Sequence, residues 1–193
     1  MKPIELIDLM NIIEYEKIRD DYRKKVINYK KHRRISLGPN VTITFENRRT
    51  LIFQIQEMMR TERLVHDKQI QAEIDVYNSI LPPDGALSAT LFIEVTEEDQ
   101  IRPILNKFIG LTVGEYLWFD CRGQKVFAQF EEGREESDKI SSVHYIQYNF
   151  KEKQVNNFID SSEAVSLNIH YKDYIYKEEL SGCMRQSLIK DLA

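Results

Sequence analysis

Charged side chains stand among apolar ones between residues 54 and 66, and their spacing could build a polar site on one helix. Glu57 precedes Arg60 by three residues and Glu62 precedes His66 by four, so each pair would share a helical face. A Glu and a His on one face could hold a metal ion, but the di-iron pattern requires Glu-x-x-His repeated on a second helix, and nothing repeats here. A surface salt-bridge network and a buried polar cluster within a binding site both agree with this segment.

Two histidines are the other candidates for site chemistry. His144 and His170 each precede a tyrosine and each fall in a predicted strand. If those strands were neighbours, the imidazoles could meet as a metal site or an acid/base pair, whereas hydrogen-bonded structural histidines would explain the same residues. We expect no cofactor. An enzyme site, if the chain carries one, is expected from Glu57, Arg60, Glu62, Arg63 and His144.

The common catalytic motifs are absent from the sequence. It contains no Gly-x-Gly-x-x-Gly, no Gly-x-x-x-x-Gly-Lys-Ser/Thr, no Gly-x-Ser-x-Gly and no His-Glu-x-x-His. The sequence therefore contains none of the motifs that usually identify a nucleotide-loop enzyme, an α/β-hydrolase or a common zinc protease. Cys121 and Cys183 lie far apart, without a CxxC motif or a histidine at ligand spacing, which favours two reduced thiols over a zinc site or a redox dithiol.

The distribution of charge is the clearest physical signal. Residues 17–34 hold nine Lys or Arg residues against two acids, in a chain whose net charge is −4. Such a basic segment could dock an acidic protein partner or another subunit, bind nucleic acid or phosphate, or be merely solvated. The acidic balance of the whole chain disfavours nucleic acid. The binding residues expected here are Lys24, Lys25, Lys30, Lys31, Arg33 and Arg34.

This basic segment is predicted to be helical. Asn11-Ile12-Ile13-Glu14 has the residue types of a capping box, and apolar residues from Ile18 to Tyr29 follow at steps of four, four and three. The pattern predicts a helix to about Arg34. Apolar residues then alternate with polar ones over 41–46 and 51–55, around a plausible turn at 47–50, which predicts a β-hairpin.

The rest of the chain alternates between segments with the apolar spacing of a helix and segments with the apolar–polar alternation of a strand. Helices are expected over about 57–66, 67–80, 97–108, 151–160 and 178–192, and strands over about 89–95, 115–121, 125–131, 141–150 and 164–171. Strands 115–121 and 125–131 are expected to form a hairpin that turns at residues 122–124. Residues 131–138 are expected to form a solvated charged loop. The chain shows no internal repeat and no flexible linker. We therefore predict one α+β domain over 1–193 with a mostly antiparallel sheet and packed helices, its helical N-terminal part about 1–38 and its sheet-rich part about 41–193.

Composition and the first residues suggest where the protein works. The chain of 193 residues is 42% hydrophobic and 30% charged, as in soluble globular proteins. No apolar run approaches the ~18–20 residues of a membrane span. Glu5 and Asp8 stand where a signal peptide would need an uninterrupted apolar core. We expect a cytoplasmic protein without a membrane partner.

Several segments, in order along the chain, resemble a bacterial family of unknown function, DUF3501. They are 14–19 (EYEKIR), 29–34 (YKKHRR), 35–48 (ISLGPNVTITFENR), 54–63 (QIQEMMRTER), 73–82 (EIDVYNSILP) and 141–145 (SSVHY). The resemblance implies no activity and no catalytic residues, because none is assigned in the family. Its genes often lie beside rubrerythrin-like proteins and iron–sulfur oxidoreductases related to heterodisulfide reductase subunits, which implies an association with redox physiology.

These observations lead to one functional expectation and two alternatives. We expect an accessory or binding protein that acts beside an iron–sulfur or rubrerythrin-type redox system and docks an acidic redox protein on its basic helix. The first alternative is an enzyme or metal protein built on the residues named above. The second is RNA or phosphate binding through residues 17–34. Homo-oligomer formation is compatible with each of them.

Overall fold

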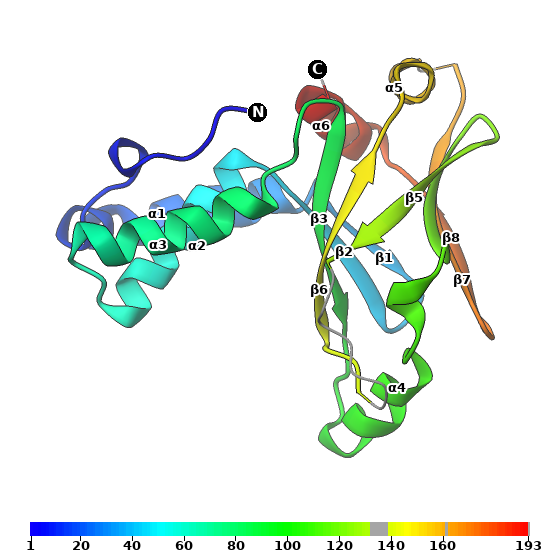
Figure 1. The fold of residues 1–193 in the computed structure, drawn as a ribbon, viewed down its shortest axis with the longest axis horizontal. Coiled ribbons are helices and arrows are strands. Elements are labelled where there is room, and N and C mark those ends of the chain that lie inside the picture. Colours follow the sequence, from blue (N-terminus) through cyan, green and yellow to red (C-terminus); the bar gives the residue numbers. More distant parts are fainter. Residues whose placement is uncertain (132–138, 161, 193) are drawn as a thin grey trace.

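A sheet curved into a near-barrel and a unit of helices projecting from its side make up the protein (Figure 1). The structure is a computed structural model and describes residues 1–131, 139–160 and 162–192. It confirms the predicted α+β class and the mostly antiparallel sheet. In the described part of the chain, no helix is both long and apolar enough to cross a bilayer.

The helical unit consists of two stretches of chain with two strands between them. Its elements are the 3-10 helix η1 (Leu6–Asp8) and the helices α1 (Ile12–Lys30), α2 (Arg48–Glu62) and α3 (Asp67–Ile80). Asn11 caps α1 by accepting a hydrogen bond from the Glu14 backbone N–H at 2.9 Å. The unit has its own apolar core, to which Leu51, Ile55 and Ile74 contribute fully buried side chains.

The first helix ends earlier than its sequence pattern predicts. Helix α1 stops at Lys30, not at Arg34, and β1 (Arg34–Leu37) follows within a few residues. The Arg33 side chain, just beyond the end of the helix, lies in the protein interior with 0% exposure.

The predicted hairpin over 41–55 is wrong. Strand β2 (Val41–Glu46) forms, but helix α2 takes the place of the turn and of the second strand. Asn47 starts this helix by exchanging hydrogen bonds with Thr50, the two residues capping each other's backbone N–H groups. Leu51 and Ile55 satisfy an alternating pattern, but they also lie four residues apart and share the buried face of α2.

The remaining strands complete one antiparallel sheet. They are β3 (Ala86–Ile93), β4 (Leu117–Cys121), β5 (Gln124–Phe130), β6 (Val143–Asn149), β7 (Val165–Tyr171) and β8 (Tyr174–Glu179). Among the described residues the order in this eight-stranded sheet is β1-β2-β3-β6-β5-β4-β7-β8. The hairpin predicted over 115–131 is confirmed as β4–β5; its turn residues Arg122 and Gly123 have positive φ angles of 58° and 75°, as a tight hairpin turn requires.

The two edge strands meet and nearly close the sheet. Tyr174 in β8 donates a hydrogen bond to the Leu37 carbonyl at 2.5 Å and accepts bonds from the backbone N–H groups of Asn40 and Val41 at 3.1 Å. The turn between β1 and β2 contains Gly38 (φ +74°), where a Cβ would lie 2.5 Å from the Tyr176 ring. Both the positive φ and this close approach require glycine.

Shorter helices cover the ends of the sheet. They are η2 (Glu98–Gln100), α4 (Ile101–Lys107), η3 (Leu111–Val113), α5 (Glu152–Ile159) and α6 (Gly182–Leu192). Figure 1 shows α6 and α4 at opposite ends of the sheet. The helix predicted over 178–192 is wrong in its first part, because residues through Glu179 extend β8 and α6 begins at Gly182. Of the loop predicted over 131–138, residues 132–138 lie outside the described part of the chain.

Candidate functional site

A strip of polar side chains runs along the outer face of β2, β3 and β6, between the core of the sheet and the core of the helical unit. We define this polar strip as Thr44, Glu46, Ser88, Thr90 and Gln147. Strand register places Glu46 beside Ser88 and Ser88 beside Gln147, with Thr44 beside Thr90 in the adjoining row. Every member except Gln147 is buried. Polar groups at such a depth require hydrogen-bond partners.

Glu46 is the only charged member of the polar strip. Its side chain is 2% exposed, and its Oε1 atom lies 3.2 Å from the Lys30 ammonium at the end of α1 and 3.5 Å from the Thr90 hydroxyl. Its other oxygen, Oε2, has no hydrogen-bond partner within the described residues. The carboxylate is therefore paired on one side and unsatisfied on the other, which is a costly arrangement inside a protein.

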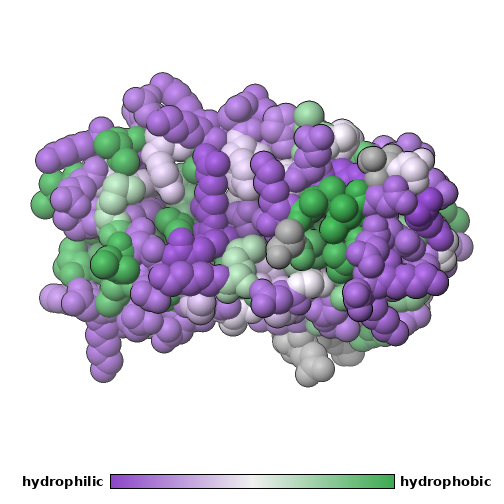
Figure 2. Space-filling model, turned by 90° about the horizontal axis from the view of Figure 1, so that it is seen from above, coloured by the Kyte–Doolittle hydropathy of each residue, from purple (hydrophilic) through white to green (hydrophobic). Residues whose placement is uncertain are grey.

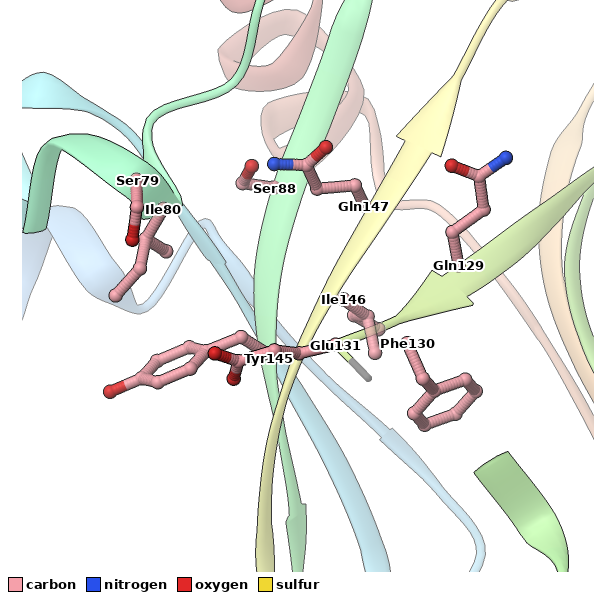
Figure 3. Close-up of a pocket in the computed structure, with 9 residues that line it drawn as sticks. All are labelled: Ser79, Ile80, Ser88, Gln129, Phe130, Glu131, Tyr145, Ile146 and Gln147. Carbon is pink, nitrogen blue, oxygen red and sulfur yellow. The ribbon is translucent and has the colours of Figure 1, made fainter. Parts of the chain in front are cut away.

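A cavity of about 290 Å³ opens beside this strip (Figure 3). The end of α3 forms one wall and strands β3, β5 and β6 form the floor. Ser88 and Gln147 stand on the floor, where Figure 3 shows their side chains close together. The Ser88 hydroxyl is buried and has no partner among the residues that the structure describes. The lining residues are Ser79, Ile80, Ser88, Gln129, Phe130, Glu131, Tyr145, Ile146 and Gln147.

Glu57, which the sequence singled out, belongs to a separate cluster between α1 and α2. Arg19 binds its carboxylate through two hydrogen bonds, Nε–Oε1 at 2.8 Å and Nη2–Oε2 at 2.7 Å, and the Tyr15 hydroxyl donates to Oε1 at 2.6 Å. The Arg19 hydrogen bonds hold the pKa of the Glu57 carboxyl below its usual range. Burial, followed by the bond to Glu57, raises the pKa of Tyr15 well above its ordinary value. Each of the three side chains therefore finds its hydrogen-bond partners within the cluster.

The other residues of the expected enzyme site do not gather around Glu57. Arg60 pairs with Glu16 at 2.8 Å, and Glu62 and Arg63 are exposed at the end of α2. His144 points into the sheet's own core with 2% exposure, where its Nε2 atom lies 2.7 Å from the Ser141 carbonyl oxygen. The sheet thus stands between His144 and the helical cluster.

The two histidines proposed as metal ligands are also separated. His170 is exposed on β7, whereas His144 is buried on β6, and strands β5 and β4 lie between these two strands. Within the described part of the chain, no group of three or more His, Cys, Asp or Glu side chains is placed to hold a metal ion. The arrangement brings the imidazoles to different faces and different strands.

Within segment 17–34, Arg19 pairs with Glu57 and Lys17 is exposed near the start of the segment, and the other seven basic residues divide into two sets. Lys30, Arg33 and Arg34 bind acids of this chain, namely Glu46, Asp191 and Glu94. Arg23, Lys24, Lys25 and Lys31 are exposed, and within the described residues only Lys24 has an ion-pair partner, Asp21 at 3.5 Å. We call these four residues the basic face. Of the expected binding residues, Lys30 and Arg33 are therefore engaged inside the protein, Arg34 forms a surface ion pair, and Lys24, Lys25 and Lys31 face outward.

Arg33 organises a buried cluster of its own. Its Nε donates to the Phe45 carbonyl at 2.9 Å and its Nη1 to the Ser187 hydroxyl at 3.0 Å, while Nη2 pairs with Asp191. Asn47 completes this Arg33 cluster by donating to the other Asp191 oxygen at 2.9 Å. The cluster joins the chain after α1, the end of β2, the start of α2 and the last helix. Its charges are paired and hydrogen-bonded, as a buried ion pair requires.

Sequence reasoning missed the polar strip. The available signal was the alternation of Thr42, Thr44 and Glu46 with apolar residues, which normally marks a strand face in contact with solvent. All six residues of β2 are buried instead, because the helical unit covers the outer face. No local pattern reveals that helices fold over a polar strand face.

Comparison with known proteins places the chain in a family. A family model described as a protein of unknown function, DUF3501, matches residues 3–192. A crystal structure of a protein of unknown function from Burkholderia pseudomallei is similar over 100% of both chains, with 26% sequence identity and a TM-score of 0.91. Curated proteins provide no match. The matches cover nearly the whole chain, and this protein therefore belongs to the DUF3501 family of proteins of unknown function.

Proposed function

We propose that this protein is a binding protein that docks an acidic protein partner on the basic face of α1. The observation that carries the proposal is the exposure of Arg23, Lys24 and Lys25 in the second half of α1 and of Lys31 directly after this helix. The rest of the chain is acidic, because the whole carries a net charge of −4 despite this segment. A cluster of positive charge on an acidic molecule orients an approaching acidic partner and accelerates the encounter.

Apolar side chains near the basic face support a role in protein docking. Ile27, between Lys24 and Lys31 in the chain, is 45% exposed, and Ile18, five residues before Arg23 on α1, is also 45% exposed. Figure 2 shows hydrophobic side chains interspersed with hydrophilic ones over the helical unit. Apolar groups surrounded by charges are typical of protein interfaces.

The proposed partner is an iron–sulfur or rubrerythrin-like redox protein. This identification rests on the gene neighbours of the family, and the basic face agrees with it only in requiring an acidic surface. The protein would then act as an accessory to the redox system.

Affinity capture from the native cell extract tests the proposal. Extract is applied at about 50 mM salt, where exposed charges are weakly screened, and bound material is eluted at high salt and analysed for protein, nucleic acid and iron. Wild type is compared with a Lys24→Glu/Lys25→Glu/Lys31→Glu variant and with a control that reverses three other exposed lysines, Lys68, Lys153 and Lys177.

We expect wild type and the control to retain one acidic, iron-containing protein in stoichiometric amount, and the basic-face variant to lose it. Equal retention by the basic-face variant would contradict docking on α1. Capture of nucleic acid in place of protein would favour RNA binding. An acidic partner without iron would keep the docking proposal and remove its redox part.

A further inference from the structure

A second binding site lies away from the basic face, in the cavity between α3 and the sheet. We propose that this cavity binds a small neutral planar molecule with an amide or amidine edge, such as a nucleobase. The argument rests on a buried hydroxyl, a neighbouring amide, the charges around the cavity and its size.

Ser88 supplies the first requirement for a ligand. The residue is 1% exposed, it lines the cavity, and its hydroxyl makes no hydrogen bond to any described residue. A buried hydroxyl without a partner destabilises the fold, because its lost hydrogen bonds to water are not replaced. A ligand group that hydrogen-bonds to this oxygen would remove that cost.

Gln147 supplies the second requirement. Strand register places it directly beside Ser88, and Figure 3 shows its amide close to the serine hydroxyl. Its neighbour in the other direction, Gln129, is occupied, since its Oε1 accepts a hydrogen bond from Asn149 at 2.7 Å. A glutamine amide presents a donor and an acceptor side by side. It therefore pairs with two hydrogen bonds to a ligand edge that also carries an acceptor and a donor, as it does with adenine.

The charges around the cavity disfavour an anion. Glu131 lines the cavity, and Glu46 lies beside Ser88 on the side away from Gln147. Ser79 and Ile80 are the last two residues of α3, so the partial negative charge of a helix C-terminus also faces this region. The nearby Lys30 is bound to Glu46. A neutral ligand with N–H donors suits these surroundings, whereas a phosphate would meet like charge.

The dimensions limit the ligand to a single ring system. The volume of about 290 Å³ lies at the lower end of the ~300–1,000 Å³ typical of small-molecule sites. Ile80 and Tyr145 flank the cavity and offer apolar surface to the face of a flat ring. A nucleobase would fit these features, and the phosphates of a nucleotide would extend beyond the cavity.

Titration calorimetry of the full chain with adenine tests the proposal. Wild type is expected to bind one adenine per chain. Gln147→Glu retains the shape of the side chain but loses the donor, so we expect about tenfold weaker binding, as loss of a net ~1.4 kcal/mol would give. Gln147→Leu is the second variant, in case the added charge impairs folding, and Gln186→Glu on the exposed face of α6 is the matched control. Thermal unfolding confirms that each variant is folded.

Adenosine monophosphate separates recognition of the base from attraction of an anion. We expect it to bind about tenfold more weakly than adenine, because its phosphate lies near the acidic rim. Three results would each overturn the proposal: no saturable adenine binding by wild type, unchanged binding by both folded Gln147 variants, or tighter binding of the monophosphate. The Lys24→Glu/Lys25→Glu/Lys31→Glu variant should bind adenine as wild type does, so this result is independent of partner docking.

Discussion

Two groups of buried polar side chains adjoin the same strand, β2, and they differ in how completely they are satisfied. In the Arg33 cluster, the guanidinium reaches a carbonyl, a hydroxyl and a carboxylate, and the carboxylate of Asp191 has a further donor in Asn47. In the polar strip, Oε2 of Glu46 and the hydroxyl of Ser88 are buried without partners in the described part of the chain.

The difference separates a structural role from a binding role. A fully hydrogen-bonded buried cluster fixes the elements that it joins, and its loss is costly. A partly satisfied one carries an energetic cost that folding alone does not recover, and a bound molecule can remove it. We therefore assign the Arg33 cluster to the architecture and the polar strip, with its cavity, to ligand binding.

The largest expected effect comes from breaking the Arg33 cluster. Arg33→Met leaves the Asp191 carboxylate buried without its cation, so we expect a loss of about 3–5 kcal/mol in the free energy of unfolding, measured by urea denaturation. Arg34→Met is the matched control, because its partner Glu94 and Arg34 itself are 44% and 52% exposed; it should cost less than about 1 kcal/mol. Similar losses of stability in both variants would contradict the structural role assigned to the Arg33 cluster.

A smaller effect is expected at Glu46. Glu46→Gln removes the charge that pairs with Lys30 but leaves an amide able to hydrogen-bond to the Thr90 hydroxyl. We expect a loss of about 1 kcal/mol in the free energy of unfolding, the difference between a charged and a neutral hydrogen bond. Urea denaturation measures it, with the exposed Glu94→Gln as control. A loss as large as that of Arg33→Met would make Glu46 part of the architecture.

The Tyr15–Arg19–Glu57 cluster is also hydrogen-bonded throughout, and its contribution to stability should depend on pH. Its hydrogen bonds lower the pKa of Glu57 below its ordinary 4.5, so the carboxylate stabilises the fold at neutral pH, and this contribution is lost as pH falls through the folded pKa. In urea denaturation from pH 7 to pH 3, Glu57→Gln should reduce stability at pH 7 and flatten the decline in acid. The exposed Glu62→Gln should change neither, and a wild-type slope in the Glu57→Gln variant would contradict the assignment.

Helices and strands are predictable from the sequence where the apolar residues fit only one spacing, that of a helix or that of a strand. Residues 117–130 formed the expected hairpin because alternation and a turn agreed, and α1 began at the expected Asn11 cap. The segment 47–55 is a helix and not a turn and a strand, because Leu51 and Ile55 fit the spacing of a helix as well as that of a strand. The hydrogen bonds by which Asn47 and Thr50 cap each other's backbone N–H groups start the helix.

The candidate site was less predictable because it depends on long-range packing. Glu57 was recognised from its neighbours along one helix, but its partner Arg19 comes from another helix. The polar strip combines residues from 44 to 147 of the chain, and its members on β2 and β3 become buried only when the helical unit covers these strands. The sequence places Arg33 among the residues of a basic surface, whereas its side chain is buried against Asp191, which lies far away in the chain.

The smallest expected change in stability is at Ser88, where one variant separates the two roles. Ser88→Ala removes a hydroxyl that has no partner, so the free energy of unfolding in urea should stay within about 0.5 kcal/mol of wild type or increase. The same variant should bind adenine several-fold more weakly. A loss of more than about 1.5 kcal/mol together with unchanged adenine binding would show that Ser88 serves the fold, and would contradict the assignment of the polar strip to ligand binding.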